Sequence, residues 1–451
     1  MRPRERKSHQ AELFLIRLDR IVSHEHELVE LSHCIGWSRF TSKFGERFYR
    51  KEGRPGISTR LMVGLHYLKY SFDLSDEEVV YRWRENPYWQ YFCGEEFFRT
   101  ELPIDPSSMT RWRKRVGTEG SRELLLETLS VGVELKALKL SELEELSVDT
   151  TVQEKNITFP TDAKLLNKMR VKLVMLAREQ GVILRQSYAR VGRKALIMQQ
   201  RYAHAKHMKR AKRQLRKLRT YLGRVIRDIE RKIAENISLQ EKFSDLLFSS
   251  TKLLRELGAK RGRTIFSIHA REVECIGKGK AHRPYEFGVK VSVVATNKSG
   301  FVLDCNAYHG RPHDAKTLKP ALEQAEENVG RLLHGAKVSV DLGYRGHLCG
   351  RTYRVLHPRL KRLLKREKHL VRRRSAIEAI ISHMKLDCRM GTNFLKGKLG
   401  DQMNAIFAAA AFNFKKLLAY IGVIYLALKI YHFFKLTHAS CRRILPSPVL
   451  A

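Results

Sequence analysis

Apolar residues recur at helical intervals over the first part of the chain. Leucines mark the buried face of one helix at Leu61, Leu65 and Leu68. Ser75 and Glu78 then occupy the two positions of a capping box, and Pro87 closes the helix that they start. The pattern predicts a helical region over residues 1–120.

The pattern changes to alternation of apolar and polar residues at 146–152, LSVDTTV, which predicts a β-strand. Further strands are expected at 285–297, 300–310 and 336–344. Residues 314–329 between them have helical character, and we expect Asp314 to cap that helix. The fold class expected is α/β, with a mixed sheet.

After the first strand, residues 161–262 return to helical spacing. The apolar seams comprise Leu166, Met169, Leu173 and Leu176, then Met208, Ala211, Leu215, Leu218, Leu222, Val225 and Ile229. Gly181 is expected to end the first helix. We expect a basic antiparallel helical hairpin inserted into the sheet domain. Residues 201–232 hold thirteen Lys or Arg against two acids, which favours a phosphate-facing role somewhat over a solvated face with no ligand.

The most apolar late stretch, residues 403–434, is interrupted by Asn413 and by three lysines. These interruptions favour packed C-terminal helices, and a membrane span is the less favoured alternative. The N-terminal sequence MRPRERKSHQ leads into no apolar core, so no secretory signal is expected.

Composition adds a partner class. The 451 residues carry a formal net charge of +39 with 43% hydrophobic residues, so we expect a folded, multidomain protein that binds a polyanion: DNA, RNA or an anionic membrane surface. The seven cysteines form no C-x-x-C pair, which argues against a zinc ribbon or a disulfide framework and fits a reducing cytosol.

A helix expected to begin after Pro106 carries Arg111, Arg113 and Lys114 around Trp112, which we expect to be buried. Short helices with basic and aromatic residues suit a helix-turn-helix-like DNA-binding module. A basic helical bundle without groove contacts fits the same pattern equally well.

Three carboxylates stand out by context. Asp149 and Asp341 each end a Val-rich strand, and Glu378 is one of only two acids between Asp341 and Asp387. A buried, unpaired carboxylate is costly, so each Asp should be exposed at its strand end or bound to a cation. If the three carboxylates converge in the fold, they form an all-oxygen site suited to Mg²⁺ or Mn²⁺.

Helical geometry puts Arg374, Glu378 and Lys385 on one stripe, beside an apolar stripe that can pack on a sheet. The apolar residues are Ile377, Ile381 and Met384. Arg374 and Lys385 could therefore hold phosphate while Glu378 holds metal. An ordinary salt-bridged helix surface would show the same Arg–Glu spacing, but it would not explain the two strand-end aspartates.

Together these residues resemble a DDE transposase of bacterial insertion sequences, of the IS-five group. The spacing of Arg374, Glu378 and Lys385 matches that group's R-(3)-E-(6)-K signature, whereas Val371 stands at its tyrosine position. The segments DLGYRG and HGRPHDAKTL are also similar to family segments, and the likeness covers most of the chain except 165–262.

The resemblance implies an RNase H-like core in which the first and fourth strands are neighbours. It also implies two-metal phosphoryl transfer: Asp149, Asp341 and Glu378 would be the catalytic residues and would bind two Mg²⁺ or Mn²⁺ ions. Arg374 and Lys385 would position phosphates, and no covalent protein intermediate is needed. The implied partner is double-stranded DNA, at transposon ends and at the target, bound by a homodimer at the bacterial nucleoid in the cytoplasm, with no membrane.

The expected domains follow from these patterns. They are a helical DNA-binding domain (1–120), a linker helix with the first strand (121–164), a basic helical insertion (165–262), the remainder of the catalytic core (263–400), and C-terminal helices with a tail (401–451). Two other functions fit the same sequence: a catalytically silent DNA-binding protein derived from a transposase, and an RNase H-like nuclease without strand transfer.

Overall fold

The computed structural model describes residues 16–45, 56–257, 264–278, 282, 284–360 and 362–444, except the side chains of 428 and 431–444. The basic N-terminal sequence MRPRERKSHQ and the last seven residues of the predicted C-terminal tail lie outside the described residues. The chain divides into two compact units. Unit 1 comprises residues 1–154 and 290–451, and unit 2 comprises residues 155–289.

The N-terminal part of unit 1 is helical, as predicted. Its helices are α1 (Glu27–Cys34), α2 (Trp37–Gly45), α3 (Thr59–Ser71), α4 (Asp76–Glu85), α5 (Pro87–Phe92) and α6 (Ser107–Glu134). The predicted capping box at Ser75 and Glu78 forms, and Pro87 is the first residue of the next helix. Gly117, with φ +65° and ψ −162°, divides α6 into two helical segments.

A mixed sheet forms the middle of unit 1, which confirms the α/β fold class. Its strands are β1 (Glu145–Lys155), β3 (Tyr285–Thr296), β4 (Val302–Tyr308), β5 (Lys337–Ser339), β6 (Arg354–Leu356) and β7 (Thr392–Asn393). The order is β3-β1-β5-β6, with β4 beside β3 and β7 beside β1. The first and fourth predicted strands, β1 and β5, are therefore neighbours, as expected, and they run parallel.

Three helices follow the later strands: α11 (Asp314–Val329), α12 (Lys365–Arg373) and α13 (Ala376–Asp387). The stripe predicted to pack on the sheet is buried, with Ile377 1% and Met384 0% exposed. Helix α11 is not capped by Asp314, contrary to the prediction. His313 is the cap, because its Nδ1 accepts a hydrogen bond from the Ala315 N–H, so Asp314 is the first helical residue.

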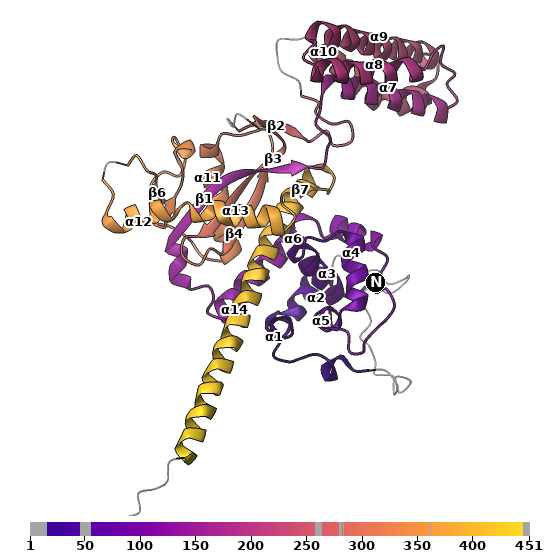
Figure 1. Ribbon diagram of the computed structural model, residues 1–451. Helices are drawn as coiled ribbons and strands as arrows, with labels where there is room; N and C mark the ends of the chain where they lie inside the picture. Colours follow the sequence, from indigo (N-terminus) through magenta and orange to yellow (C-terminus); the bar gives the residue numbers. More distant parts are fainter. Residues whose placement is uncertain are drawn as a thin grey trace, which may run out of the picture. The chain divides into compact units, whose positions relative to one another are not determined.

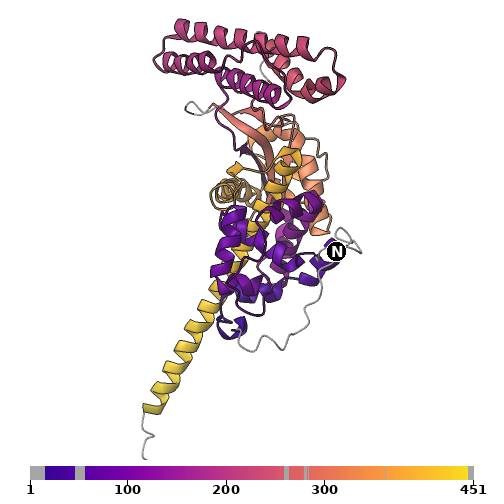
Figure 2. The ribbon, with the colours of Figure 1, turned by 90° about the vertical axis from the view of Figure 1, so that its right-hand side faces the viewer.

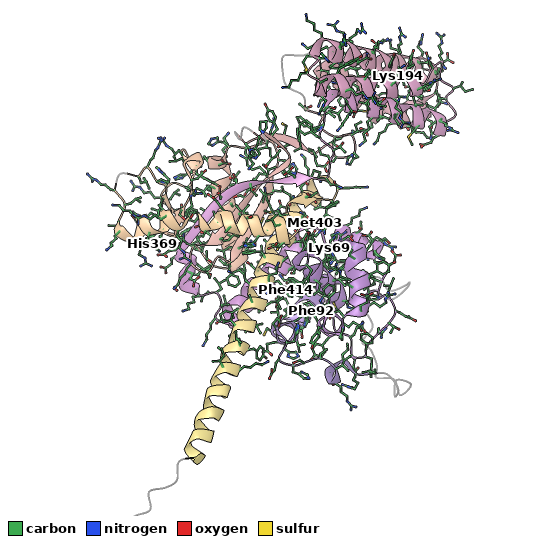
Figure 3. All side chains as sticks on the ribbon, in the orientation of Figure 1. Lys69, Phe92, Lys194, His369, Met403 and Phe414 are labelled. Carbon is green, nitrogen blue, oxygen red and sulfur yellow. The ribbon has the colours of Figure 1, made fainter. Side chains whose placement is uncertain are left out.

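The C-terminal region is one long helix, α14 (Gly397–Ile444), instead of the several helices predicted (Figure 1). No proline or other break interrupts it, so the backbone hydrogen bonds can continue. Its first half packs on α3, α6 and β4. Phe414 stacks on Tyr67 at 4.9 Å between ring centroids and meets Phe92 edge-on at 5.5 Å. Figure 3 labels Phe414 and Phe92.

Residues Gly397–Ala427 are long and apolar enough to cross a membrane. However, 56% of the most apolar window is buried inside the protein, and its core residues include Phe407 and Phe414. A core helix of a soluble protein meets the same criterion, so the packing supports a core role for the first half of α14.

Unit 2 holds four helices, α7 (Asp162–Glu179), α8 (Ala189–His204), α9 (Met208–Ile233) and α10 (Ile237–Glu256), and the short strand β2 (Glu274–Gly277) beside the start of β3. The helices lie side by side as a bundle (Figures 1 and 2). The predicted two-helix hairpin is therefore wrong. The chain turns between α8 and α9 at Lys206, which has a left-handed φ of +59°.

Both predicted seams do form the core of this bundle. Leu166, Leu173, Leu222 and Ile229 are fully buried, although Met208 at the start of α9 is 56% exposed. Gly181, with φ +69°, ends the first helix as predicted, and the Val182 N–H bonds back to the Ala177 carbonyl.

Candidate active site

Strand register brings Asp149 and Asp341 side by side, although Asp149 lies in the middle of β1 and does not end that strand, contrary to the prediction. β1 and β5 pair in parallel with Ser147 opposite Ser339, and the two buried Ser hydroxyls lie 2.9 Å apart. Each aspartate follows its serine by two residues, so both side chains leave neighbouring strands at the same level and on the same face. Asp341 lies just beyond the carboxyl end of β5, and the carboxyl ends of parallel strands are where α/β proteins place ligands.

Backbone amides fix both carboxylates. Asp149 Oδ1 accepts a hydrogen bond from the Thr150 N–H at 2.7 Å, and Asp341 Oδ1 accepts one from the Gly343 N–H at 2.8 Å. Asp341 thereby caps a 3₁₀ turn, Leu342–Tyr344. The oxygens that remain can accept other donors or a cation.

Arg374 connects Asp149 with Glu378. One guanidinium nitrogen lies 3.4 Å from Asp149 Oδ2 and another lies 3.2 Å from Glu378 Oε1. Arg374 follows the last residue of α12, and α13, which carries Glu378, begins two residues later. Arg374 is therefore not part of the helix that holds Glu378 and Lys385, as the predicted stripe required, although it still pairs with Glu378, whose side chain is 63% exposed. Lys385, the third member of the predicted stripe, is half-buried.

The electrostatics of Asp149 reflect this setting. Burial raises its pKa to about 6; the charges of Asp341 and Glu378 act in the same direction, while the Thr150 N–H and Arg374 oppose the rise. Negative charge is therefore concentrated around Asp149 and is only partly balanced. Such imbalance is typical of functional sites.

A fourth carboxylate, Asp314, belongs to this group and was missed as a site residue. Its Oδ1 lies 2.8 Å from both the Thr150 hydroxyl and Lys290 Nζ. Its side chain also approaches Asp341, because a β-carbon at Gly343 would lie 3.1 Å from Asp314 Oδ2 and 3.0 Å from Asp341 Oδ1. Asp314 lies in the segment HGRPHDAKTL that resembles the family, but nothing local connects it with Lys290, 24 residues away in the chain.

Tyr344 lies beneath these acids. It is 1% exposed, and burial, followed by the charges of Asp149, Asp314 and Asp341, raises its pKa well above the usual value. The hydroxyl of Tyr344 therefore stays protonated beside the acids.

The donor set fits a hard divalent cation by chemistry, since carboxylate oxygens are the ligands Mg²⁺ prefers. Among the described residues, however, no three His, Cys, Asp or Glu side chains are close enough to hold a metal ion as they stand. In this structure the Arg374 guanidinium is the cation that lies between Asp149 and Glu378. A metal would have to replace that contact.

The predicted DNA-contacting residues of α6 separate into two groups. Arg111 and Lys114 are exposed, and Trp112 is buried as expected. Arg113 is only 3% exposed, and both guanidinium nitrogens bind Asp76. That burial contradicts a phosphate-binding role for Arg113, which is part of the core of the N-terminal helices.

Comparisons with known proteins are consistent with this geometry. A family model described as "Transposase domain (DUF772)" matches residues 16–115, and one described as "Transposase DDE domain" matches residues 260–414. The "Uncharacterized protein ORF8 in nfe locus" of Rhizobium meliloti is 51% identical over 206 residues, which cover 46% of this chain and 99% of that protein. No solved structure matches the chain significantly. The second match begins after unit 2's helices, so it contains Asp341 and Glu378 but not Asp149.

Proposed function

Since transposase domain models match residues 16–115 and 260–414, we propose that the chain is a DDE transposase of the IS-five group, which cuts DNA at transposon ends and joins the freed ends to target DNA. The single observation that carries the proposal is the parallel register of β1 and β5, which sets Asp149 beside Asp341, with Glu378 joined to Asp149 through Arg374. The R-(3)-E-(6)-K spacing supports the group assignment, although Val371 departs from its tyrosine.

Asp149, Asp341 and Glu378 would hold the divalent metal ions, two Mg²⁺ or Mn²⁺. When bound, such ions supply Lewis-acid charge to the scissile phosphate and to the attacking and leaving oxygens. The chain's own residues would do the rest. Asp341 and Asp149 are held rigid by backbone N–H groups, and the exposed Glu378 can turn toward them once it is released from Arg374.

Arg374 then has a second role. A guanidinium binds phosphate oxygens in the same two-pronged manner as carboxylates, so incoming DNA would compete with Asp149 and Glu378 for it. Lys385 would contact a further phosphate along the same stripe. Arg111 and Lys114 on α6 would bind the backbone of the transposon end, without Arg113. We expect the active form to be a homodimer on double-stranded DNA at the nucleoid, with no membrane involved.

The test uses the variants Asp149→Asn, Asp341→Asn and Glu378→Gln. The matched control is Asp387→Asn, on the same helix as Glu378. Each of the three should bind DNA carrying the ends that flank the gene but lose Mg²⁺-dependent cleavage and joining, whereas the control should keep both. If all three still cut, the assignment of the site is wrong. Cleavage without joining by the unaltered chain would instead indicate a nuclease without strand transfer.

One observation favours a second candidate, a catalytically silent DNA-binding protein. Arg374 already neutralises Asp149 and Glu378, and no described trio of acids can hold metal as it stands. This function predicts that the unaltered chain binds end DNA but never cuts it in Mg²⁺ or Mn²⁺, and that Glu378→Gln changes nothing measurable.

A further inference from the structure

The positive charge of the unit 2 bundle is densest over one continuous segment of the chain, here called its basic side. Residues 180–227 contain fifteen Lys or Arg and no Asp or Glu. They comprise the connection after α7, helix α8 and most of α9. Helix α10 of the same bundle is balanced, with three basic and three acidic residues. A bundle needs charged residues only for solubility, and mixed signs serve that purpose better. The asymmetry therefore calls for a partner with negative charge.

Part of this basic side forms a pocket of about 400 Å³ between the 181–188 connection and α9. Its lining residues are Arg185, Gln186, Tyr188, Arg224, Arg227, Asp228, Glu230 and Arg231. A second hollow, on α8, is also lined by four cations, among them the exposed Lys194 (Figure 3). Basic side chains thus gather at the concave parts of this side.

The pocket is built by contacts within the bundle. Asp228 is 6% exposed, and its Oδ2 accepts a hydrogen bond from the Arg185 N–H at 2.8 Å, which fixes the connection against α9. Tyr188 has a left-handed φ of +53° and stacks on Tyr221 with ring centroids 4.8 Å apart. The backbone positions that carry the cations are therefore fixed relative to one another.

Three of the four arginines are left without an anionic partner. Arg231 lies 3.6 Å from Asp228, but Arg185, Arg224 and Arg227 form no ion pair with any residue that the structure describes. All three are exposed. Arg224 and Arg227 are neighbours at i, i+3 on α9, where like charges repel and destabilise the helix. A bound phosphate would relieve this repulsion, and the guanidinium fork matches its oxygens.

We propose that this pocket, with the basic side of α8 and α9, binds the phosphate backbone of duplex DNA without reading its bases. The inference rests on the proposed function only in taking DNA as the partner. Because the site lies outside the carboxylate group, it requires no catalysis. Binding through phosphates alone releases counterions in proportion to the contacts made, so it has a measurable salt dependence.

The experiment measures binding of the full-length chain to a fluorescein-labelled duplex of arbitrary sequence, by anisotropy, between about 50 and 200 mM salt. The test variant is Arg185→Gln, Arg224→Gln, Arg227→Gln. The matched control is Lys242→Gln, Lys252→Gln, Arg255→Gln on α10, which removes the same charge from the same bundle. Circular dichroism melting verifies that both variants fold.

The test variant should bind about tenfold or more weakly at low salt, and the slope of log K against log salt should fall by about 2–3. The control should change affinity less than about threefold. Replacing the same three arginines by Lys should restore most of the slope, because charge is kept. That rescue also separates lost contacts from misfolding.

Equal binding by test and control variants would overturn the proposal. A test variant with unchanged DNA affinity but a changed oligomeric mass, measured by light scattering, would also overturn it, because the pocket would then be a protein interface. Failure of the unaltered chain to bind any duplex would overturn it too. If the unaltered chain binds DNA through this pocket but cuts nothing, the proposed function fails while this inference stands.

Discussion

The Arg374 guanidinium lies 3.4 Å from the Asp149 carboxylate, although the two residues are 225 positions apart in the chain. The same side chain also binds Glu378. One cation thus balances two of the three acids expected to hold metal. The pKa of Asp149 is nevertheless raised, because burial outweighs the effect of Arg374. In the proposed function, a divalent metal ion would take the place of Arg374 between these acids.

Arg374→Gln should make the apo protein bind Mn²⁺ more tightly, because the acids lose their internal cation. Isothermal titration without DNA would measure this, with the exposed Arg372→Gln as the control. DNA cleavage by Arg374→Gln should nevertheless fall, since the phosphate contact is lost. Weaker or unchanged Mn²⁺ binding would show that Arg374 does not compete with metal.

Asp149→Asn should stabilise the metal-free protein at pH 8 but not at pH 4. The folded pKa is about 6, above the ordinary value of 3.8, so the folded chain retains a proton that the unfolded chain loses as pH rises from about 4 to 6. Above pH 6 Asp149 is ionised in both the folded and the unfolded chain. Burial of its charge then lowers the free energy of unfolding by up to about 3 kcal/mol. Urea denaturation at both pH values measures the difference, and equal effects at the two would contradict it.

Asp314→Asn should lower cleavage about ten- to a hundredfold while DNA binding remains, because Lys290 loses its charge partner and Thr150 loses a strong acceptor beside Asp149. Glu323→Gln, on an exposed face of the same helix, is the control and should be silent. Normal cleavage by the Asp314 variant would leave that residue a purely structural role.

Gly343→Ala should reduce cleavage without unfolding the protein. The added β-carbon would lie 3.0 Å from Asp341 Oδ1 and 3.1 Å from Asp314 Oδ2, so the two carboxylates must move apart. Gly422→Ala in α14 meets no atom within 4 Å and serves as the control. Equal activity of both alanine variants, at equal melting temperature, would show that the acids tolerate displacement.

Asp76→Asn should destabilise the N-terminal helices by about 3–5 kcal/mol. Asp76 binds Arg113 and the buried Lys69, and removing its charge leaves two cations uncompensated. Although burial opposes it, their hydrogen bonds and charges hold the Asp76 pKa well below its usual value. Asp73→Asn, 55% exposed, is the control in chemical denaturation. A loss below about 1 kcal/mol would contradict this account.

Local sequence pattern predicted the elements well where one short-range rule governs them. The capping box at Ser75 and Glu78 and the buried stripe beside Glu378 need only residues within a turn or two. The turn at Lys206 is marked by neither Gly nor Pro, and the two apolar seams cover only α7 and α9, so α8 and α10 were not recognised as separate helices. Hence a four-helix bundle was taken for a hairpin.

By itself, the sequence determined the periodicities, the charge and the three carboxylates, because each depends on residues close together in the chain. Only the tertiary structure decided which partners the polar side chains contact. It put Arg113 into the core against Asp76, freed Asp314 from capping because His313 caps instead, and set Lys290 and Thr150 against it. Such contacts join segments whose order in space is fixed by strand pairing and burial, and no local pattern encodes them.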